Sequence, residues 1–160
     1  MKNPCLRFIA AGVLFLLAAS IAWSKLPLSS LSIFAGDLSQ PIAVTDPKIL
    51  RASNPWFGTF IPQWNQTPSQ QPDRPPEAAP RYEILFYASL SPKAPPHIVY
   101  MAYYAFDSAS HRGFLYLPGQ HEKWYSTNAG SILRPNQDGR WNLADPAWCD
   151  QINSMISRSR

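Results

Sequence analysis

The segment from His97 to Tyr125 constrains the fold of this chain more than any other. It is aromatic and β-prone, and turn-forming residues interrupt it at short intervals, which is typical of an antiparallel sheet. Apolar residues stand on both sides of the alternation in His97–Asp107, so we predict a central strand there. Asp107–His111 is then a polar hairpin loop, and Arg112–Leu117 the returning strand, which ends at Pro118.

Further strands are expected on both sides of this segment. Before it, Arg81–Leu90 alternates cleanly between an apolar and a mixed face, which indicates a strand with one buried face. At its end and beyond it, we predict short strands at Glu122–Ser126, Ser131–Arg134 and Arg140–Leu143, separated by turns that contain glycine. These elements together predict a meander of about five or six strands.

The C-terminal segment has the pattern of a helix. Asp145 can cap its first turn, and Pro146 suits the first helical position because a proline there sacrifices no hydrogen bond. Its apolar residues recur at helical spacing and form one stripe, which should cover one face of the sheet: Trp148, Ile152, Met155 and Ile156. A shorter helix is expected within residues 45–54, where Asp46 and Pro47 repeat the same start signal.

The N-terminal half is less regular. Residues 25–40 suit a linker or an edge strand, and residues 55–64 concentrate aromatic side chains that either cover the sheet as a lid or form an exposed patch. Five prolines in residues 65–80 predict an extended spacer. We therefore divide the exported chain into an irregular aromatic segment (25–64), this spacer, and an antiparallel β domain with a C-terminal helix (81–160), which defines the α+β class.

The first residues predict export. Lys2 and Arg7 precede an apolar run from Phe8 to Trp23, which is long for a signal peptide and slightly short for a bilayer span. Residues 1–24 are therefore either a cleaved signal peptide or a single-pass anchor that crosses the membrane through residues 8–23. In both cases the bulk of the chain is expected on the non-cytoplasmic side of the cytoplasmic membrane.

The charge of the chain argues against nucleic-acid binding, and its cysteines argue against a disulfide. The chain has fourteen basic and ten acidic residues, but Lys2 and Arg7 belong to the leader, so the remainder carries twelve against ten, a formal net charge of +2. This charge is too small and too scattered for a nucleic-acid-binding protein.

Cleavage of the leader would remove Cys5 and leave Cys149 alone, so we predict no disulfide and interpret Cys149 as a buried residue on the C-terminal helix.

No catalytic or cofactor motif stands out. His111 and His121 fall in expected turns at the same end of neighbouring strands, where Asp107 or Glu122 could join them around a metal, yet their spacing matches no metal-binding motif. The serines have no nucleophile motif around them, and the glycines are too scattered for a phosphate loop. We therefore predict no metal and no cofactor, and keep a hydrolase of unknown type only as a remote alternative.

Two non-catalytic functions fit the layout better. The first is an accessory protein of the cell envelope, exported or tethered, which docks a membrane-protein or envelope-complex partner through aromatic surfaces that include Trp56 and Trp64. The second is a carbohydrate-binding module, whose rings would stack on sugars while two polar neighbours supply hydrogen bonds; its candidate residues are Trp124, Tyr125, Trp141, Arg140 and Asn142. Core packing is the alternative role for each of these tryptophans. An exposed coplanar pair of rings favours a sugar, whereas a broad mixed apolar patch favours a protein partner.

Overall fold

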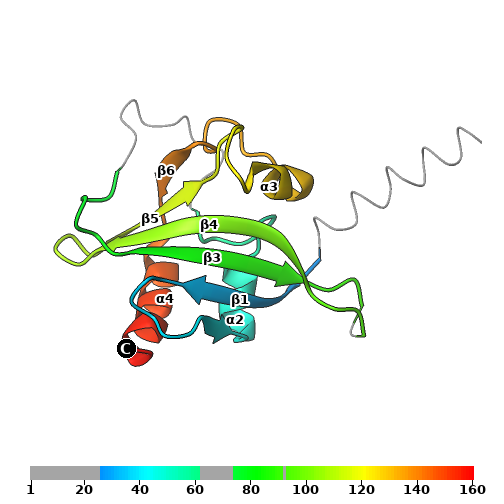
Figure 1. Cartoon of the computed structure of the whole chain (residues 1–160), viewed down its shortest axis with the longest axis horizontal. Coiled ribbons are helices and arrows are strands. Elements are labelled where there is room, and N and C mark those ends of the chain that lie inside the picture. Colours follow the sequence, from blue (N-terminus) through cyan, green and yellow to red (C-terminus); the bar gives the residue numbers. More distant parts are fainter. Residues whose placement is uncertain (1–25, 62–73, 92) are drawn as a thin grey trace, which may run out of the picture.

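The computed structural model describes residues 26–61, 74–91 and 93–160, which form a six-stranded antiparallel sheet and three helices (Figure 1). The predicted α+β class is therefore confirmed. The elements in chain order are β1 (Leu28–Phe34), β2 (Ile42–Val44), α2 (Pro47–Ala52), β3 (Arg81–Ala88), β4 (His97–Asp107), β5 (Arg112–Leu117), α3 (Tyr125–Ser131), β6 (Arg140–Leu143) and α4 (Pro146–Arg158). The leader predicted for residues 1–24, Trp64 and residues 65–73 of the spacer lie outside the described residues. Across the described ranges, none of the helices is long and apolar enough to cross a membrane.

The strands lie in the order β2-β1-β3-β4-β5-β6. The last four are neighbours in sequence order, as the predicted meander requires, and β4 is central. The expectation of a linker or edge strand in residues 25–40 is wrong, because β1 is an inner strand in which Leu31 pairs with Phe86 on one side and with Val44 on the other. Its serines, Ser30 and Ser32, stand on the face away from the core and weaken the apolar signal.

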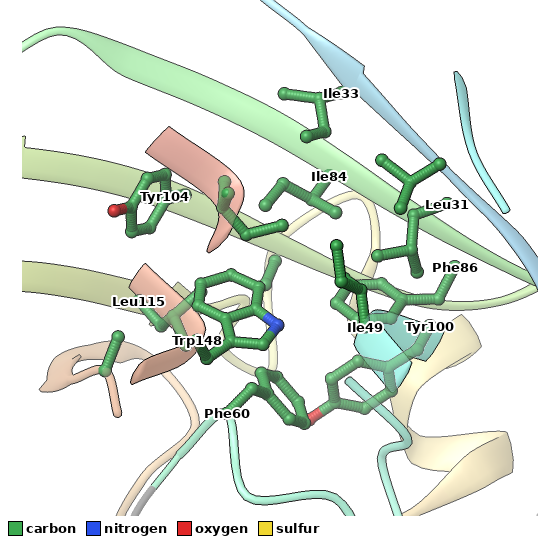
Figure 2. Packing of buried hydrophobic residues seen from close by; sticks show 14 of the residues in the cluster. Leu31, Ile33, Ile49, Phe60, Ile84, Phe86, Tyr100, Tyr104, Leu115 and Trp148 are labelled. Atoms are coloured by element: carbon green, nitrogen blue, oxygen red, sulfur yellow. The ribbon is translucent and has the colours of Figure 1, made fainter. Parts of the chain in front are cut away.

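The core lies between one face of the sheet and the helices α2 and α4 (Figure 1). Trp148 of α4 is 1% exposed and lies at its centre, with its ring centroid 5.4 Å from that of Tyr104 and 5.9 Å from that of Phe60 (Figure 2). Its indole N–H donates to the hydroxyl of Ser53 at 2.7 Å, just after α2. This buried bond connects α4 to the C-terminal end of α2. It also gives a partner to the indole N–H, which would otherwise be desolvated without one.

The two predicted helix starts are confirmed. The Asp46 carboxylate accepts from the backbone N–H of Lys48 at 2.8 Å, and that of Asp145 accepts from the N–H of Trp148 at 2.9 Å. In both cases a proline occupies the first turn. Cys149 of α4 is 2% exposed, as predicted for a buried cysteine on this helix.

The strands predicted at Glu122–Ser126 and Ser131–Arg134 are wrong, because this region forms α3. Strand β4 has eleven residues and β5 only six, and their pairing begins at Tyr103, so β5 does not reach the first half of β4. The side-chain amide of Asn128 on α3 takes the place of the missing strand. It accepts from the N–H of Met101 and donates to the carbonyl of the same residue, both at 2.8 Å.

The aromatic segment that begins at Pro55 divides between two environments. Phe60 and Ile61 are buried in the core, and Trp56 packs against it, as the lid interpretation predicts. Phe57, however, is 58% exposed. The lid interpretation is therefore confirmed for Phe60, Ile61 and Trp56, whereas the exposed patch stays a prediction that the single exposed Phe57 does not test.

Candidate functional site: an aromatic row flanked by arginines

The face of the sheet opposite the core carries a row of aromatic side chains. Because successive side chains of a strand point to opposite faces, Tyr103 of β4 points away from its core neighbours Ala102 and Tyr104. The register places Tyr103 beside Tyr116 of β5, and Tyr116 beside Trp141 of β6. We call Tyr103, Tyr116 and Trp141 the aromatic row, and the face that carries it the second face.

The rings of the aromatic row touch but are not coplanar. The centroids of Tyr103 and Tyr116 lie 6.2 Å apart with their planes at 45°, and those of Tyr116 and Trp141 lie 5.4 Å apart at 56°. All three side chains are partly buried. The guanidinium of Arg81, from β3, lies over the Trp141 ring at 5.5 Å from its centroid. The row is therefore a corrugated surface with a cation on one ring, and not a flat platform.

Arg81 and Trp141 lie at the boundary of two hollows, since both residues line each of them. The first hollow has a volume of about 480 Å³ and is also lined by Phe34, Glu83 and Tyr103. The second has a volume of about 670 Å³ and combines aromatic and charged residues: Tyr116, Arg74, Glu77 and Arg140. The two hollows are therefore neighbours that share the Arg81–Trp141 pair.

The second hollow has an excess of positive charge. Three arginines, Arg74, Arg81 and Arg140, line it together with one carboxylate, Glu77. In the ranges that the structure describes, none of these arginines forms an ion pair, and Arg140 makes only a long hydrogen bond, 3.5 Å, to a backbone carbonyl. Guanidinium groups bind carboxylates in a bidentate manner. This arrangement can therefore bind an anionic group beside an aromatic surface.

Glu122 holds the middle ring of the row in place. One oxygen of its carboxylate accepts from the Tyr116 hydroxyl at 2.9 Å, and the other accepts from the backbone N–H of Gly119 at 2.6 Å. Burial, followed by the hydrogen bond and the negative charge of Glu122, raises the pKa of Tyr116 to about 12. The hydroxyl is a neutral donor at physiological pH, and its hydrogen bond to Glu122 orients the ring between its neighbours.

The structure does not bring the residues predicted for sugar binding together. Trp141 and Arg140 belong to the second face, but Trp124 is the N-cap residue of α3 and has the Lys123 ammonium 4.9 Å from its ring centroid. Tyr125 is the first residue of α3, and no ring contact joins it or Trp124 to Trp141 within the described chain.

The other predicted site residues have structural surroundings or cannot be placed. The amide of Asn142 donates to backbone carbonyls of Gln137 and Arg140, both at 3.1 Å, so it closes the turn before β6. Trp56 packs against the core. Trp64 lies outside the described residues.

The histidines are dispersed. His97 begins β4 and His111 follows its other end, while His111 and His121 precede and follow β5. The expectation that His111 and His121 share one end of neighbouring strands is therefore wrong, because a single strand separates them. Over the parts of the chain that the structure describes, no three His, Cys, Asp or Glu residues lie close enough together to hold a metal ion.

Sequence reasoning did not identify Arg81, Tyr103 or Tyr116 as site residues. The alternation did place Arg81 opposite the core face of its strand, but in His97–Asp107 both sides are apolar, so it assigned Tyr103 to neither a core nor an exposed side. However, the periodicity of one strand does not show which residues are neighbours across the sheet. It therefore does not predict that the Arg81 guanidinium lies over the Trp141 ring. Register is decided by pairing between distant segments.

Comparison with family models, curated proteins and solved structures gives no match for this chain. The class of protein is therefore described by the fold alone, an α+β domain with a six-stranded antiparallel sheet.

Proposed function

We propose that this protein is a non-catalytic accessory protein of the cell envelope that docks an acidic, extended segment of a membrane-protein partner on the second face. The observation that carries this proposal is the Arg81–Trp141 pair at the boundary of two hollows, with Arg74 and Arg140 close by and no ion pair among these three arginines in the described residues. Tryptophan, tyrosine and arginine are the residues that contribute most to the affinity of protein interfaces.

The geometry of the rings favours a protein over a sugar. Stacking on a sugar ring needs an accessible flat aromatic face, whereas the Trp141 ring has the Arg81 guanidinium over it and its neighbour Tyr116 tilted by 56°. A corrugated surface that mixes aromatic and charged groups is typical of protein interfaces. The arginines add charge complementarity, which gives a docking surface its specificity and its association rate.

The leader supports the proposed location. The basic residues Lys2 and Arg7 followed by the apolar run from Phe8 to Trp23 direct the chain to the cytoplasmic membrane, with the bulk on the non-cytoplasmic side. A partner with a segment on that side of the membrane is then accessible to the second face.

The test is recovery of the partner from host membranes with three forms of the full-length tagged chain. These are the wild type, the double charge reversal Arg81→Glu with Arg140→Glu, and the control Arg158→Glu, which changes an exposed arginine at the end of α4. We expect one membrane protein to be retained stoichiometrically by the wild type and the control and lost with the double variant. Retention should weaken as salt increases, because exposed charges are screened.

Two results would count against the proposal. Equal retention of the same partner by the double variant would exclude the second face as the docking surface. Recovery of the wild type without a partner, together with binding to a glycan array that Trp141→Ala abolishes, would favour the carbohydrate-binding alternative.

A further inference from the structure

Exposed apolar side chains gather at one end of the molecule. Among the residues that the structure describes, the large hydrophobic side chains that remain half or more exposed are Phe57 (58%), Leu90 (50%) and Leu133 (50%). They come from three connections far apart in the sequence. Single exposed apolar residues are ordinary on a protein surface, but several in one region indicate an interaction site.

The start of β1 brings the first two together. Phe57 lines an apolar hollow of about 540 Å³ together with Pro27 and Leu28. Leu28 pairs with Ala88, the last residue of β3, and Leu90 follows two residues later. Phe57 and Leu90 therefore flank the point where the described chain enters the sheet.

Leu133 belongs to the same end. The next residue, Arg134, is buried and donates from its guanidinium to the carbonyl of Pro55, two residues before Phe57. Two residues earlier, the hydroxyl of Ser131 donates to the carbonyl of Val99, near the start of β4. In the view of Figure 1, α3 and the start of β1 lie right of centre and the β3–β4 connection lies at the lower right, whereas the β4–β5 hairpin lies at the far left.

The sequence places this end near the apolar run. The run from Phe8 to Trp23 ends four residues before Pro27, and four residues span at most about 14 Å. A run that is retained in the bilayer therefore holds Pro27, and the hollow that it lines, within about this distance of the point where the chain leaves the hydrocarbon region.

Basic residues accompany the apolar ones. Arg51 lines the hollow beside Phe57, and Lys93 lies in the β3–β4 connection three residues after Leu90; both are exposed. Basic side chains near a membrane surface are attracted to anionic lipid headgroups, and aromatic side chains favour the interface. The charge of this end therefore complements an anionic lipid surface.

From this arrangement we infer that the end of the domain formed by Phe57, Leu90 and Leu133, together with Arg51 and Lys93, rests on the lipid headgroups of the membrane that anchors the chain. This inference rests on the tethering part of the proposed function and not on the docking part. In this orientation the strands lead away from the bilayer and the second face is turned sideways, toward neighbouring membrane proteins.

The test uses the full-length chain inserted in vesicles of phosphatidylcholine and phosphatidylglycerol. Cys5→Ser removes the leader thiol, Cys149 is buried, and single cysteines at positions 57, 90 and 133 carry an environment-sensitive fluorophore. Position 108, an exposed serine in the β4–β5 hairpin, is the matched control. We expect lipids with a spin label at the headgroup to quench the first three fluorophores strongly and the control weakly, and Arg51→Glu with Lys93→Glu to reduce the quenching.

Equal quenching at all four positions would overturn the inference. So would fluorophores that stay unquenched in pure lipid while the same cysteines are protected from aqueous maleimide in host membranes, since that result assigns this end to a protein. Finding the processed chain free of residues 1–24 in its host would also overturn it, while docking on the second face would remain testable with the charge-reversal variants.

Discussion

The Arg81 guanidinium covers the ring of Trp141 at 5.5 Å, although two other strands, β4 and β5, lie between theirs in the sheet. The contact runs diagonally across the second face. It joins Arg81, the first residue of β3, to Trp141 of β6. A cation over a partly exposed indole ring stabilises a protein by roughly 0.5–1 kcal/mol. The pair is thus both a local stabilising contact and the centre of the proposed docking surface.

This contact predicts a measurable coupling. In a double-mutant cycle of Arg81→Ala and Trp141→Ala, we expect a coupling free energy of about 0.5–1 kcal/mol from urea unfolding, because each substitution removes the same cation–π contact. Arg81→Lys should keep part of it, since the charge remains and the planar group is lost. Purely additive effects of the two alanine substitutions would show that the contact does not form in solution.

Gly113 of β5 predicts an overpacking effect. A Cβ atom at this position would lie 2.1 Å from the sulfur of Cys149 and 3.0 Å from the Tyr104 ring, so either the side chains or the strand must move. We expect Gly113→Ala to lower the free energy of unfolding by about 1–3 kcal/mol. Adding Cys149→Ala should recover part of this loss, because the nearest atom is then absent.

Gly130 of α3 is the matched control for this substitution, since nothing lies within 4 Å of a Cβ atom there. Gly130→Ala should be neutral or stabilising by up to about 1 kcal/mol, because alanine restricts the unfolded chain. A Gly113→Ala variant as stable as Gly130→Ala would contradict the close packing of α4 against β5.

The two hydrogen bonds between Asn128 and Met101 should stabilise the part of β4 that β5 leaves unpaired. Asn128→Ala leaves the buried N–H and carbonyl of Met101 without their partner, so we expect a loss of about 2–4 kcal/mol in the free energy of unfolding. The amide hydrogen of Met101 should also exchange faster in the native state. Ser126→Ala, at an exposed position of the same helix, is the control and should change neither quantity. Unchanged exchange at Met101 in the Asn128 variant would mean that another group covers this edge.

Cys149 predicts a pH dependence of stability. Burial raises the pKa of its thiol from 9.0 to about 11, so above pH 9 the unfolded chain loses this proton before the folded protein does. Stability therefore falls as the pH rises from about 9 to 11, by on the order of 1 kcal/mol at pH 10. The stability difference between the wild type and Cys149→Ala should change by this amount from pH 8 to pH 10.

The same burial makes the thiol unreactive in the folded protein. At pH 8 a thiol reagent should modify Cys149 only after denaturant unfolds the chain. Fast labelling of the native Cys5→Ser protein would show that α4 opens away from the sheet.

Local patterns predicted the elements whose signals are complete within one segment. The alternation in Arg81–Ala88 and His97–Asp107, the turn before Arg112, and the Asp-Pro starts of α2 and α4 all appear in the structure. Each depends on residues no more than a few positions apart, since periodicity and capping are local effects. The buried position of Cys149 follows from the apolar stripe of α4 in the same way.

The prediction for the region of α3 was wrong because its structure depends on residues far away in the sequence. The sequence Tyr125–Ser131 contains serine, threonine, asparagine and glycine, none of which favours a helix strongly, and we predicted strands beside it. Its helix lies against the part of β4 that β5 leaves unpaired, and Asn128 satisfies that edge. The requirement arises from the unequal lengths of two strands, which a local pattern does not show.

The sequence by itself determined the class of the fold, the central strands and the two capped helices, because each is specified by the order and spacing of nearby residues; the leader in residues 1–24 stays a prediction. Only the tertiary structure decided that β1 is an inner strand, that Tyr103, Tyr116 and Trp141 form one row with Arg81 over it, and that Phe57, Leu90 and Leu133 remain exposed. These relationships depend on the register between strands and on the direction in which each connection returns, and both are set by packing among residues far apart in the chain.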